Sequence, residues 1–525
     1  MPDLVPAPDR TRPFVPLWGA VLLAIAAGFV TDAAFPDRGW WPLAFAGVAM
    51  VLVAAQGRRA GAGFLVGLVF GWTFYLVHIP WMTEFLGPNE ALIVRAVPWV
   101  ALSTLMALWC GLGTMLISIA TRVVPRAVKG PVGRLLFVPL VVAGLWTARE
   151  AVSSIWPYGG FAWGRIAESQ SDSPIAPLFA WLGISGVGFV MVYLVATAVA
   201  TVRETDTPAL LRATLVTAIA AVLLAFPAFP VTTHDTLRVG AVQGNGKTGY
   251  FDPAENVGDN LMAQYDATEP VYAQDVDVVV WPEGASDLDP LRVPGAARVF
   301  DSVSRQADAP LVGWAITKQG EQYFNSSLLW RDGEGALDHY DKRHPVPFGE
   351  YVPDRAVWRQ FAPDLIDLIQ REFTPGTTDA VMDVGSDGRH VLAGFAICFD
   401  IVDDALMREG VDEGGQLVIA PTNNADFGQT DESVQQLAIA RIRAIELGRS
   451  VVNISTVGTS AIILPDGTIA ETLPRYEAGA MVADVPLSTT TTPAVVIGRG
   501  VEWGVAVIAI GALIGAALGG RRRRA

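Results

Sequence analysis

The sequence predicts a polytopic α-helical membrane protein of about eight spans that also carries a soluble α/β domain. Its 525 residues are 51% hydrophobic and only 17% charged, with a mean hydropathy of +0.38; soluble domains are less apolar than this. Long apolar runs fill the chain before residue 232 and return near its C-terminal end. Between them, short β-rich runs alternate with helical runs, a pattern typical of mixed α/β domains.

Seven apolar runs before residue 232 are close to the length that crosses a membrane. A hydrocarbon core of ~30 Å requires ~20 helical residues, and only the second run is clearly shorter. Because further spans follow the first run, we expect an anchor there and not a cleavable signal peptide. The expected spans are Leu17–Phe35, Trp41–Ala55, Ala62–Ile79, Val97–Ala120, Leu135–Val152, Ala176–Ala200 and Leu211–Phe229, with an eighth at Val501–Gly519.

The basic residues between the spans predict the orientation. One alternating set of connections holds 14 Lys and Arg residues and the other only 4, so the positive-inside rule places both termini in the cytoplasm and the α/β block outside. The expected parts are a seven-span domain at 1–231, an extracytoplasmic domain at 232–487, and a linker, eighth helix and basic tail at 488–525. The basic-rich set contains Arg10, Arg12, Arg58, Arg59, Arg122, Arg126, Lys129, Arg134, Arg203, Arg212 and Arg521–Arg524.

Charge, cysteine and histidine contents exclude several classes of protein. Residues 237–487 hold 39 acidic and 18 basic side chains, and the rest of the chain holds 13 and 19. An acidic soluble block on a basic membrane block does not suit a nucleic-acid binder. Two cysteines make no disulfide framework, and Cys110 lies in an apolar run that faces helices or lipid. Five histidines without ligand spacing give no metal signal.

The α/β block of about 250 residues is long enough to bury its own core. It begins with a strand-like run at Leu237, and the turn Pro465-Asp-Gly467 predicts a hairpin. Further strands are expected at Val276–Trp281, Pro310–Ile316, Ser326–Trp330, Val391–Cys398, Gln416–Ile419, Ser450–Ser455 and Thr459–Leu464, and helices at Pro253–Thr268, Gly295–Ala307, Asp403–Glu409 and Glu432–Gly448.

The stretch Val391–Asp404 places Cys398 where nucleophiles commonly lie. An apolar strand leads into the thiol, and a turn and a helix follow it. The strand should fix the backbone, and the N-terminus of the helix should lower the pKa of the thiol. This stretch alone leaves a buried structural cysteine as the alternative, because free cysteine packs as a small hydrophobe.

Glu283 stands at the end of a run of valines in DVVVWPEG. A carboxylate beside an aromatic residue and an apolar strand should have a raised pKa, which suits a general base near neutral pH. Considered without its neighbours, the same residue is an ordinary loop carboxylate.

The stretch Tyr340–Pro353, YDKRHPVPFGEYVP, combines basic residues with three prolines and Glu350. Such a stiff loop can hold Lys342 and Glu350 in place, and an ammonium group near a thiol can stabilise an oxyanion. Without that context Lys342 is a solvated charge. His344 suggests a Cys–His dyad, but the proline that follows it argues against one.

Three further stretches are distinctive. WMTE at 81–84 and SSIWPYGGFAWG at 153–164 carry aromatic residues on the side expected for the α/β block, where they form an aromatic belt or line an entry path for lipid. TNNADFG at 422–428 predicts a loop after a strand. In ARIRAIELGR at 440–449, Arg443 and Glu446 are spaced for pairing on one helix.

The order Glu283, Lys342, Cys398 resembles the catalytic triad of the carbon–nitrogen hydrolase (nitrilase) superfamily. With YDKRHPVPFGEYVP, WPEG, TNNADFG, ARIRAIELGR and the flanking spans, nearly the whole chain resembles one membrane branch of it, the apolipoprotein N-acyltransferase family. The resemblance implies a nitrilase-like αββα-sandwich, a bacterial cell membrane location, a phospholipid acyl donor, a diacylglyceryl-lipoprotein acceptor and no cofactor.

The resemblance also implies roles for individual residues. Cys398 takes the acyl chain as a thioester and passes it to the α-amine of the acceptor, with Glu283 as the base. Lys342 and the backbone N–H of Phe399 form the oxyanion site, and Glu350 supports the triad. The family usually has Tyr-Glu after the cysteine where this chain has Phe399-Asp400, and often a bulky aromatic where it has Asp426.

Two other functions remain as alternatives. A membrane-tethered amidase or nitrilase would use the same three residues with water as the acceptor. A non-catalytic lipid- or lipoprotein-binding module would keep the fold without the chemistry, and the intact triad argues against it. The number of spans and the aromatic outer loops favour a lipid substrate over a soluble amide.

Overall fold

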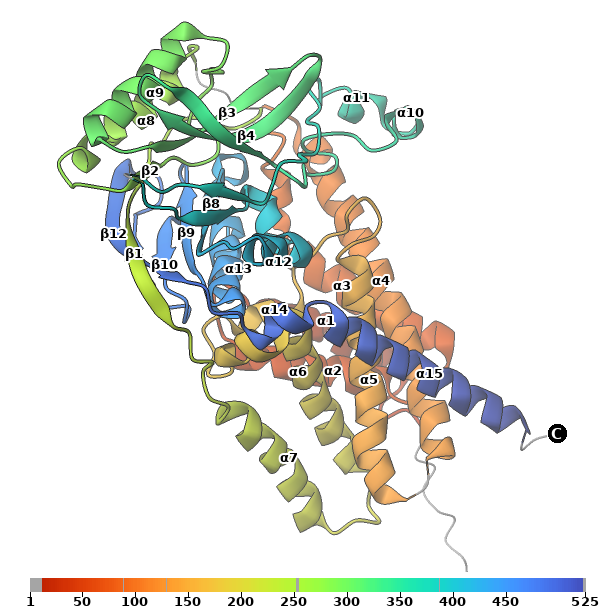
Figure 1. Cartoon of the computed structure of the whole chain (residues 1–525). Coiled ribbons are helices and arrows are strands. Elements are labelled where there is room, and N and C mark those ends of the chain that lie inside the picture. The colour runs from red at the N-terminus through yellow and green to blue at the C-terminus, as the bar shows by residue number, and fades with distance from the viewer. Residues whose placement is uncertain (1–11, 88, 129, 252–254, 387, 523–525) are drawn as a thin grey trace, which may run out of the picture.

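The structure is a computed structural model that describes residues 12–522 except 88, 129, 252–254 and 387. Arg10, Lys129 and Arg523–Arg524 of the basic set, and the start of the helix expected from Pro253, lie outside the described residues. A bundle of apolar helices forms one end of the molecule and a two-sheet domain the other (Figure 1).

Apolar helices occupy the eight expected positions in the described part of the chain. Five of these segments are long and apolar enough to cross a membrane, whereas α1, α2 and α7 have only 14 to 16 residues. The prediction of about eight spans is therefore supported for five helices. The eight are α1 (Leu17–Asp32), α2 (Pro42–Ala55), α3 (Ala60–His78), α4 (Leu92–Ala127), α5 (Pro131–Ser153), α6 (Phe179–Arg203), α7 (Ala209–Leu224) and α15 (Gly500–Arg522).

Small residues set the contact between α3 and α4. A Cβ added to Gly63, Gly67 or Gly71 would lie within 2.6 Å of α4 atoms. Bundles without a hydrophobic driving force between helices rely on such close backbone approach. The last helix, α15, returns to the bundle beside α5, where a Cβ on Gly144 would lie 2.7 Å from Ala509.

Two six-stranded sheets pack face to face, and one apolar core joins them with a covering helix. This core includes Val279 of the first sheet, Phe395 and Ile419 of the second, and Phe300 of the helix at Pro294–Ala307. The first sheet has the order β12-β1-β2-β3-β4-β5 and the second β11-β10-β9-β8-β7-β6. The strands are β1 (Thr233–Gln243), β2 (Val278–Val280), β3 (Leu311–Gln319), β4 (Gln322–Arg331), β5 (Gly335–Asp341), β6 (Val381–Asp383), β7 (Leu392–Phe395), β8 (Leu417–Thr422), β9 (Ser450–Ser455), β10 (Ala461–Ile463), β11 (Ile469–Thr472) and β12 (Gly479–Ser488).

Helices cover the outer face of each sheet and complete the αββα layering expected from the resemblance. α8 (Asp259–Ala267) and α9 (Pro294–Ala307) lie on the first sheet. α12 (Asp404–Asp412) and α13 (Glu432–Leu447) lie on the second, between it and the membrane helices (Figure 1). Short helices α10 (Arg355–Trp358), α11 (Pro363–Ile366) and α14 (Pro493–Ile497) belong to connections.

Most expected elements of this domain are present, and the differences have physical reasons. The hairpin at Pro465–Gly467 joins β10 and β11. β5 was not expected because it is a mostly exposed edge strand whose sequence, GALDHYD, lacks an apolar face. The strand expected to run to Cys398 ends at Phe395, because the chain turns into a short 3-10 helix, η5 (Cys398–Val402).

Candidate active site

The three residues of the predicted triad meet at one end of the sandwich. Glu283 follows β2, Lys342 directly follows β5, and Cys398 follows β7 of the opposite sheet. The Lys342 Nζ lies 3.4 Å from Glu283 Oε1 and 2.9 Å from Glu350 Oε2. Glu283 and Lys342 are buried. The three triad side chains and Glu350 line one cavity.

Burial and neighbouring charges set the protonation of these groups. Burial raises the pKa of Glu283, and the Lys342 ammonium, the Asn325 amide and the nearby Cys398 thiol oppose that effect. Burial lowers the pKa of Lys342, but Glu283 and Glu350 more than offset it, so the lysine stays charged. The raised pKa predicted for Glu283 is therefore confirmed.

The expectation that a helix N-terminus lowers the pKa of Cys398 is wrong. Burial, and then the Glu283 carboxylate, raise the pKa of this thiol well above its ordinary value. The helix that follows, α12, begins only at Asp404, six residues after Cys398, so Cys398 does not lie at the N-terminus of this helix. A protonated thiol beside a carboxylate needs that carboxylate as a base before it can attack.

The backbone at Cys398 is left-handed, with φ +52°. A non-glycine residue in this region costs about 1–3 kcal/mol and persists only where its surroundings hold it. The Arg443 guanidinium supplies part of that support, because it donates 2.8 Å hydrogen bonds to the carbonyls of Ile401 and Val402 in the same turn. Such a turn presents the thiol to the cavity.

Two asparagines that the sequence did not single out donate hydrogen bonds to the Glu283 carboxylate. The Asn325 amide, on β4, donates to Glu283 Oε1 at 2.6 Å and to Glu350 Oε1 at 3.0 Å. The backbone N–H of Asn423 donates to Glu283 Oε2 at 2.9 Å. An asparagine inside an otherwise ordinary strand gives no sequence signal, whereas Asn423 lies in the TNNADFG stretch already noted.

Asp400 is fully buried and joins the cysteine turn to the lysine loop. Its carboxylate accepts hydrogen bonds from the Tyr340 hydroxyl at 2.8 Å, the His344 backbone N–H at 2.9 Å and the Ile397 backbone N–H at 3.3 Å. The His344 side chain instead pairs with Asp403 and is nearly half exposed. The side chain of His344 therefore pairs with Asp403 and not with the Cys398 thiol. This agrees with the expectation that the two residues form no dyad.

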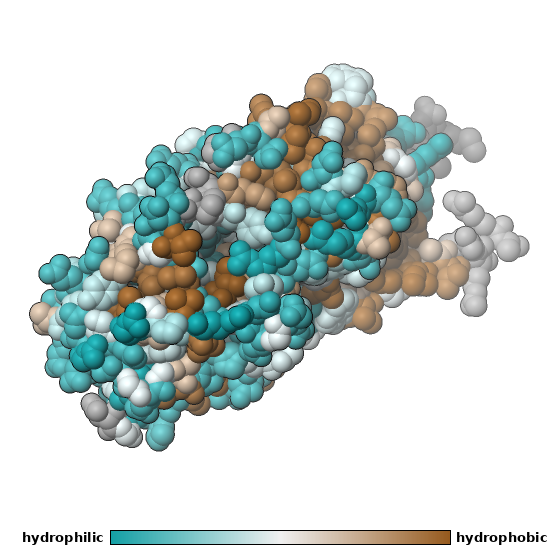
Figure 2. Space-filling model, turned by 90° about the horizontal axis from the view of Figure 1, so that it is seen from above, coloured by the Kyte–Doolittle hydropathy of each residue, from teal (hydrophilic) through white to brown (hydrophobic). Residues whose placement is uncertain are grey.

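The cavity beside Cys398 reaches from the triad into the membrane helices. Its volume is about 240 Å³, and most of its lining is apolar. Phe399 forms part of the wall and stacks on Phe161 of the aromatic loop at 153–164, with ring centroids 6.2 Å apart. Seen from above, hydrophobic patches surround a hollow in a largely hydrophilic face (Figure 2). The α4 residues in the lining are Pro98, Leu102, Leu105, Met106 and Trp109.

Comparisons with known proteins agree with this arrangement. Residues 27–197 match the profile of the apolipoprotein N-acyltransferase N-terminal domain, and residues 238–493 match that of the carbon–nitrogen hydrolases. An apolipoprotein N-acyltransferase of Mycolicibacterium smegmatis is 31% identical over 94% of this chain and 84% of its own length. The chain belongs to the apolipoprotein N-acyltransferase family. It is therefore an enzyme of the acyltransferase class.

Two further matches are less similar to this chain than the first. The apolipoprotein N-acyltransferase of Shewanella oneidensis is 28% identical over 90% of this chain and 91% of its own length. Among solved structures, an amidase from Nesterenkonia sp. is 20% identical, with a TM-score of 0.37 over 50% of this chain and 94% of the amidase.

Two further acidic residues, Asp426 and Glu432, line the cavity of this apolipoprotein N-acyltransferase family member. The Asp426 carboxylate accepts the backbone N–H of Tyr250 at 2.6 Å, and burial raises the pKa of Asp426 to about 7. Glu432 accepts a 2.7 Å hydrogen bond from Asn424, and burial raises the pKa of Glu432 to about 8. Near neutral pH Glu432 is mostly protonated and Asp426 is partly protonated, so together they add less negative charge than two ionised carboxylates.

Proposed function

We propose that this chain moves a fatty acyl group from a membrane phospholipid, through a thioester on Cys398, to the α-amine of the N-terminal diacylglyceryl-cysteine of apolipoproteins. One observation carries the proposal. Cys398, Glu283 and Lys342 line the same cavity as apolar residues of the membrane helix α4. A nucleophile whose cavity continues between membrane helices suits an ester with a long acyl chain.

In the first half-reaction the Cys398 sulfur attacks the ester carbonyl while Glu283 takes the thiol proton. The Lys342 ammonium and the backbone N–H of Phe399 stabilise the oxyanion. The carbon–oxygen bond then breaks, Glu283 returns the proton to the leaving oxygen, and a lysophospholipid departs. Glu350 and Asn325 hold Lys342 and Glu283 in register through their hydrogen bonds.

In the second half-reaction the acceptor amine attacks the thioester. Glu283 takes a proton from the amine and returns one to the sulfur, which restores the free thiol. The thioester remains reactive enough to acylate an amine. The phospholipid ester is therefore the energy source for both steps. The same cavity serves donor and acceptor in turn, as a ping-pong reaction requires.

The proposed placement follows the distribution of basic residues. The domain at 232–487 lies on the outer side of the bacterial cell membrane, the membrane domain at 1–231 anchors it, and 488–525 returns the chain to the cytoplasm. Both substrates are anchored in lipid, so the thiol has to lie close to the outer leaflet. The aromatic loops around Trp81 and Phe161 line the path to it.

A direct assay tests the proposal. Purified protein is incubated with phospholipid vesicles and a diacylated lipopeptide, and mass spectrometry follows the N-acyl product. Product should form, and Cys398→Ser should form neither product nor thioester. Release of free fatty acid or ammonia from small amides, without N-acylation, would favour the membrane-tethered hydrolase. Lipid binding without any turnover would favour the non-catalytic module.

A further inference from the structure

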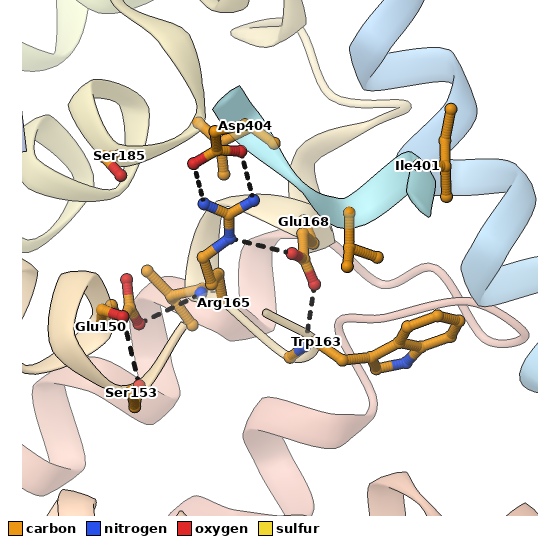
Figure 3. A network of polar contacts seen from close by, with 12 residues as sticks. Glu150, Ser153, Trp163, Arg165, Glu168, Ser185, Ile401 and Asp404 are labelled. Atoms are coloured by element: carbon orange, nitrogen blue, oxygen red, sulfur yellow. Dashed lines mark hydrogen bonds and ion pairs between the residues drawn. The ribbon is translucent and has the colours of Figure 1, made fainter. Parts of the chain in front are cut away.

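Arg165 of the membrane domain reaches the segment that follows the cysteine turn (Figure 3). Its guanidinium donates two hydrogen bonds to the Asp404 carboxylate, at 2.7 Å and 3.0 Å. The arginine is 4% exposed, and such a two-pronged contact fixes orientation as well as distance. Asp404 is the first residue of α12, six positions after Cys398.

The same carboxylate also contacts a second buried arginine. Arg443 Nη2 donates to Asp404 Oδ1 at 2.7 Å and to the Val402 carbonyl, and its Nε donates to the Ile401 carbonyl. The Nη1 of Arg443 pairs with Glu446. Together the two guanidiniums hold the pKa of Asp404 well below its usual range despite burial, which opposes that effect. The left-handed turn of Cys398 is thus fixed through Arg443, and Asp404 links Arg443 to Arg165.

The membrane side of Arg165 is held as firmly. Its Nε donates to Glu168 at 3.2 Å, and Glu168 accepts the backbone N–H of Gly164 at 2.8 Å (Figure 3). The next residue, Ile166, donates its backbone N–H to Glu150 of α5 at 3.3 Å. Polar contacts, joined through the peptide bond between Arg165 and Ile166, therefore connect a membrane helix to the turn of Cys398.

We infer that Arg165 is a positioning residue for Cys398, through which the membrane domain holds the cysteine turn in the conformation that reacts with lipid esters. The inference rests on the proposed role of Cys398 as the nucleophile. Loss of Arg165 leaves Asp404 with Arg443 alone and lets α12 and the turn shift against the cavity. Small displacements of a reacting atom slow chemistry far more than they weaken binding.

A second ion pair at the same interface supplies a matched control. Arg441 lies on α13 two residues before Arg443 and pairs with Asp172 of the membrane domain. Arg441 also donates to the Gly467 carbonyl at 3.0 Å, and its contacts lie away from the cysteine turn. Asp172→Asn therefore weakens docking between the two parts without touching the support of Cys398.

The test measures acylation of Cys398 in the full-length protein. Wild type, Arg165→Met, Arg165→Lys and Asp172→Asn are mixed with phosphatidylethanolamine vesicles, and intact mass gives the rate of acyl-enzyme formation per folded molecule. We expect Arg165→Met to slow acylation at least about tenfold. The lipid concentration for half-maximal rate should stay within about twofold, Arg165→Lys should recover part of the rate, and Asp172→Asn should match wild type.

Gel filtration and thermal unfolding distinguish a misplaced Cys398 in folded protein from a loss of folded protein. If Arg165→Met fails to fold, the rate of folded Arg165→Lys decides in its place. Wild-type rates per folded molecule in the Arg165 variants would overturn the inference and leave Arg165 as a docking contact. If wild type forms no acyl-enzyme, or Cys398→Ser still forms one, the proposed function itself fails, and this is seen without any change at Arg165.

Discussion

The Tyr340 hydroxyl donates a 2.8 Å hydrogen bond to Asp400 and so ties the end of β5, just before Lys342, to the turn of Cys398. Lys342 and Cys398, the proposed oxyanion lysine and nucleophile, follow strands of different sheets, and this contact joins their loops directly. The family resemblance implies a glutamate at position 400, and Asp400 is one methylene shorter. Its carboxylate already reaches all its donors, which explains how the shorter side chain serves.

Replacing Asp400 should affect stability and rate together. Asp400→Ala removes the acceptor of the Tyr340 hydroxyl and of three backbone N–H groups, at about 1–3 kcal/mol for each group that stays buried and unsatisfied. Asp400→Glu adds a methylene to a filled site, which costs about 1–3 kcal/mol. Thermal unfolding and the rate of N-acylation measure both effects. Tyr340→Phe is the milder control, and an unchanged rate in Asp400→Glu would mean that the site accepts either acid.

The site residues that could be predicted from the sequence are those whose immediate neighbours along the chain form a recognisable pattern. Glu283 and Cys398 follow apolar strands, and Lys342 lies in a stiff proline-rich loop, so each stands out within a few residues. Asn325 does not, because one amide in a strand has no distinct pattern. Arg165 does not either, because its partner lies 239 residues away. The eight helical positions were likewise readable from hydropathy, but the length of each helix was not.

Asn325 should tune the base. Its amide hydrogen bond lowers the pKa of Glu283 against the larger effect of burial, so Asn325→Ala should raise that pKa further. Because the base acts when deprotonated, the acidic limb of the pH–rate profile should move to higher pH. We expect a rate loss of about 10²-fold at neutral pH. A profile that keeps its position would show that Asn325 is not coupled to the base.

The same strand provides a control for Asn325. Ser327 is buried on β4, and its hydroxyl has no hydrogen-bond partner among the described residues. Ser327→Ala should therefore leave both the rate and the pH–rate profile unchanged.

Leu102 on α4 should set the length of acyl chain that the cavity accepts. It lines the cavity, and Leu102→Trp would fill space that a long chain needs. Each acyl-chain methylene that no longer fits in the cavity costs on the order of 1 kcal/mol of binding free energy. The variant should therefore transfer short acyl chains in preference to long ones. Mass spectrometry of lipopeptide acylated from phospholipids of mixed chain length measures the shift. Leu108→Trp, at a position 43% exposed on the same helix, should keep the wild-type distribution.

Glu432 should make the stability of the protein fall as pH rises. Burial raises the pKa of Glu432 to about 8 in the folded protein, from about 4.5 when unfolded. Between these values the folded state keeps a proton that the unfolded state has lost. The stabilisation is therefore complete below about pH 4.5 and is lost as pH rises through about 8, at no more than about 1.4 kcal/mol per pH unit.

Thermal unfolding between pH 5 and pH 9 tests this sign. The wild-type midpoint should fall with rising pH more steeply than that of Glu432→Gln, whose neutral amide fills the same space and does not titrate. Other groups titrate in this range, so the difference between the two proteins is the quantity that matters. Glu471→Gln, at an exposed carboxylate on β11, should keep the wild-type slope. Parallel curves for wild type and Glu432→Gln would mean that Glu432 is already ionised in the folded protein.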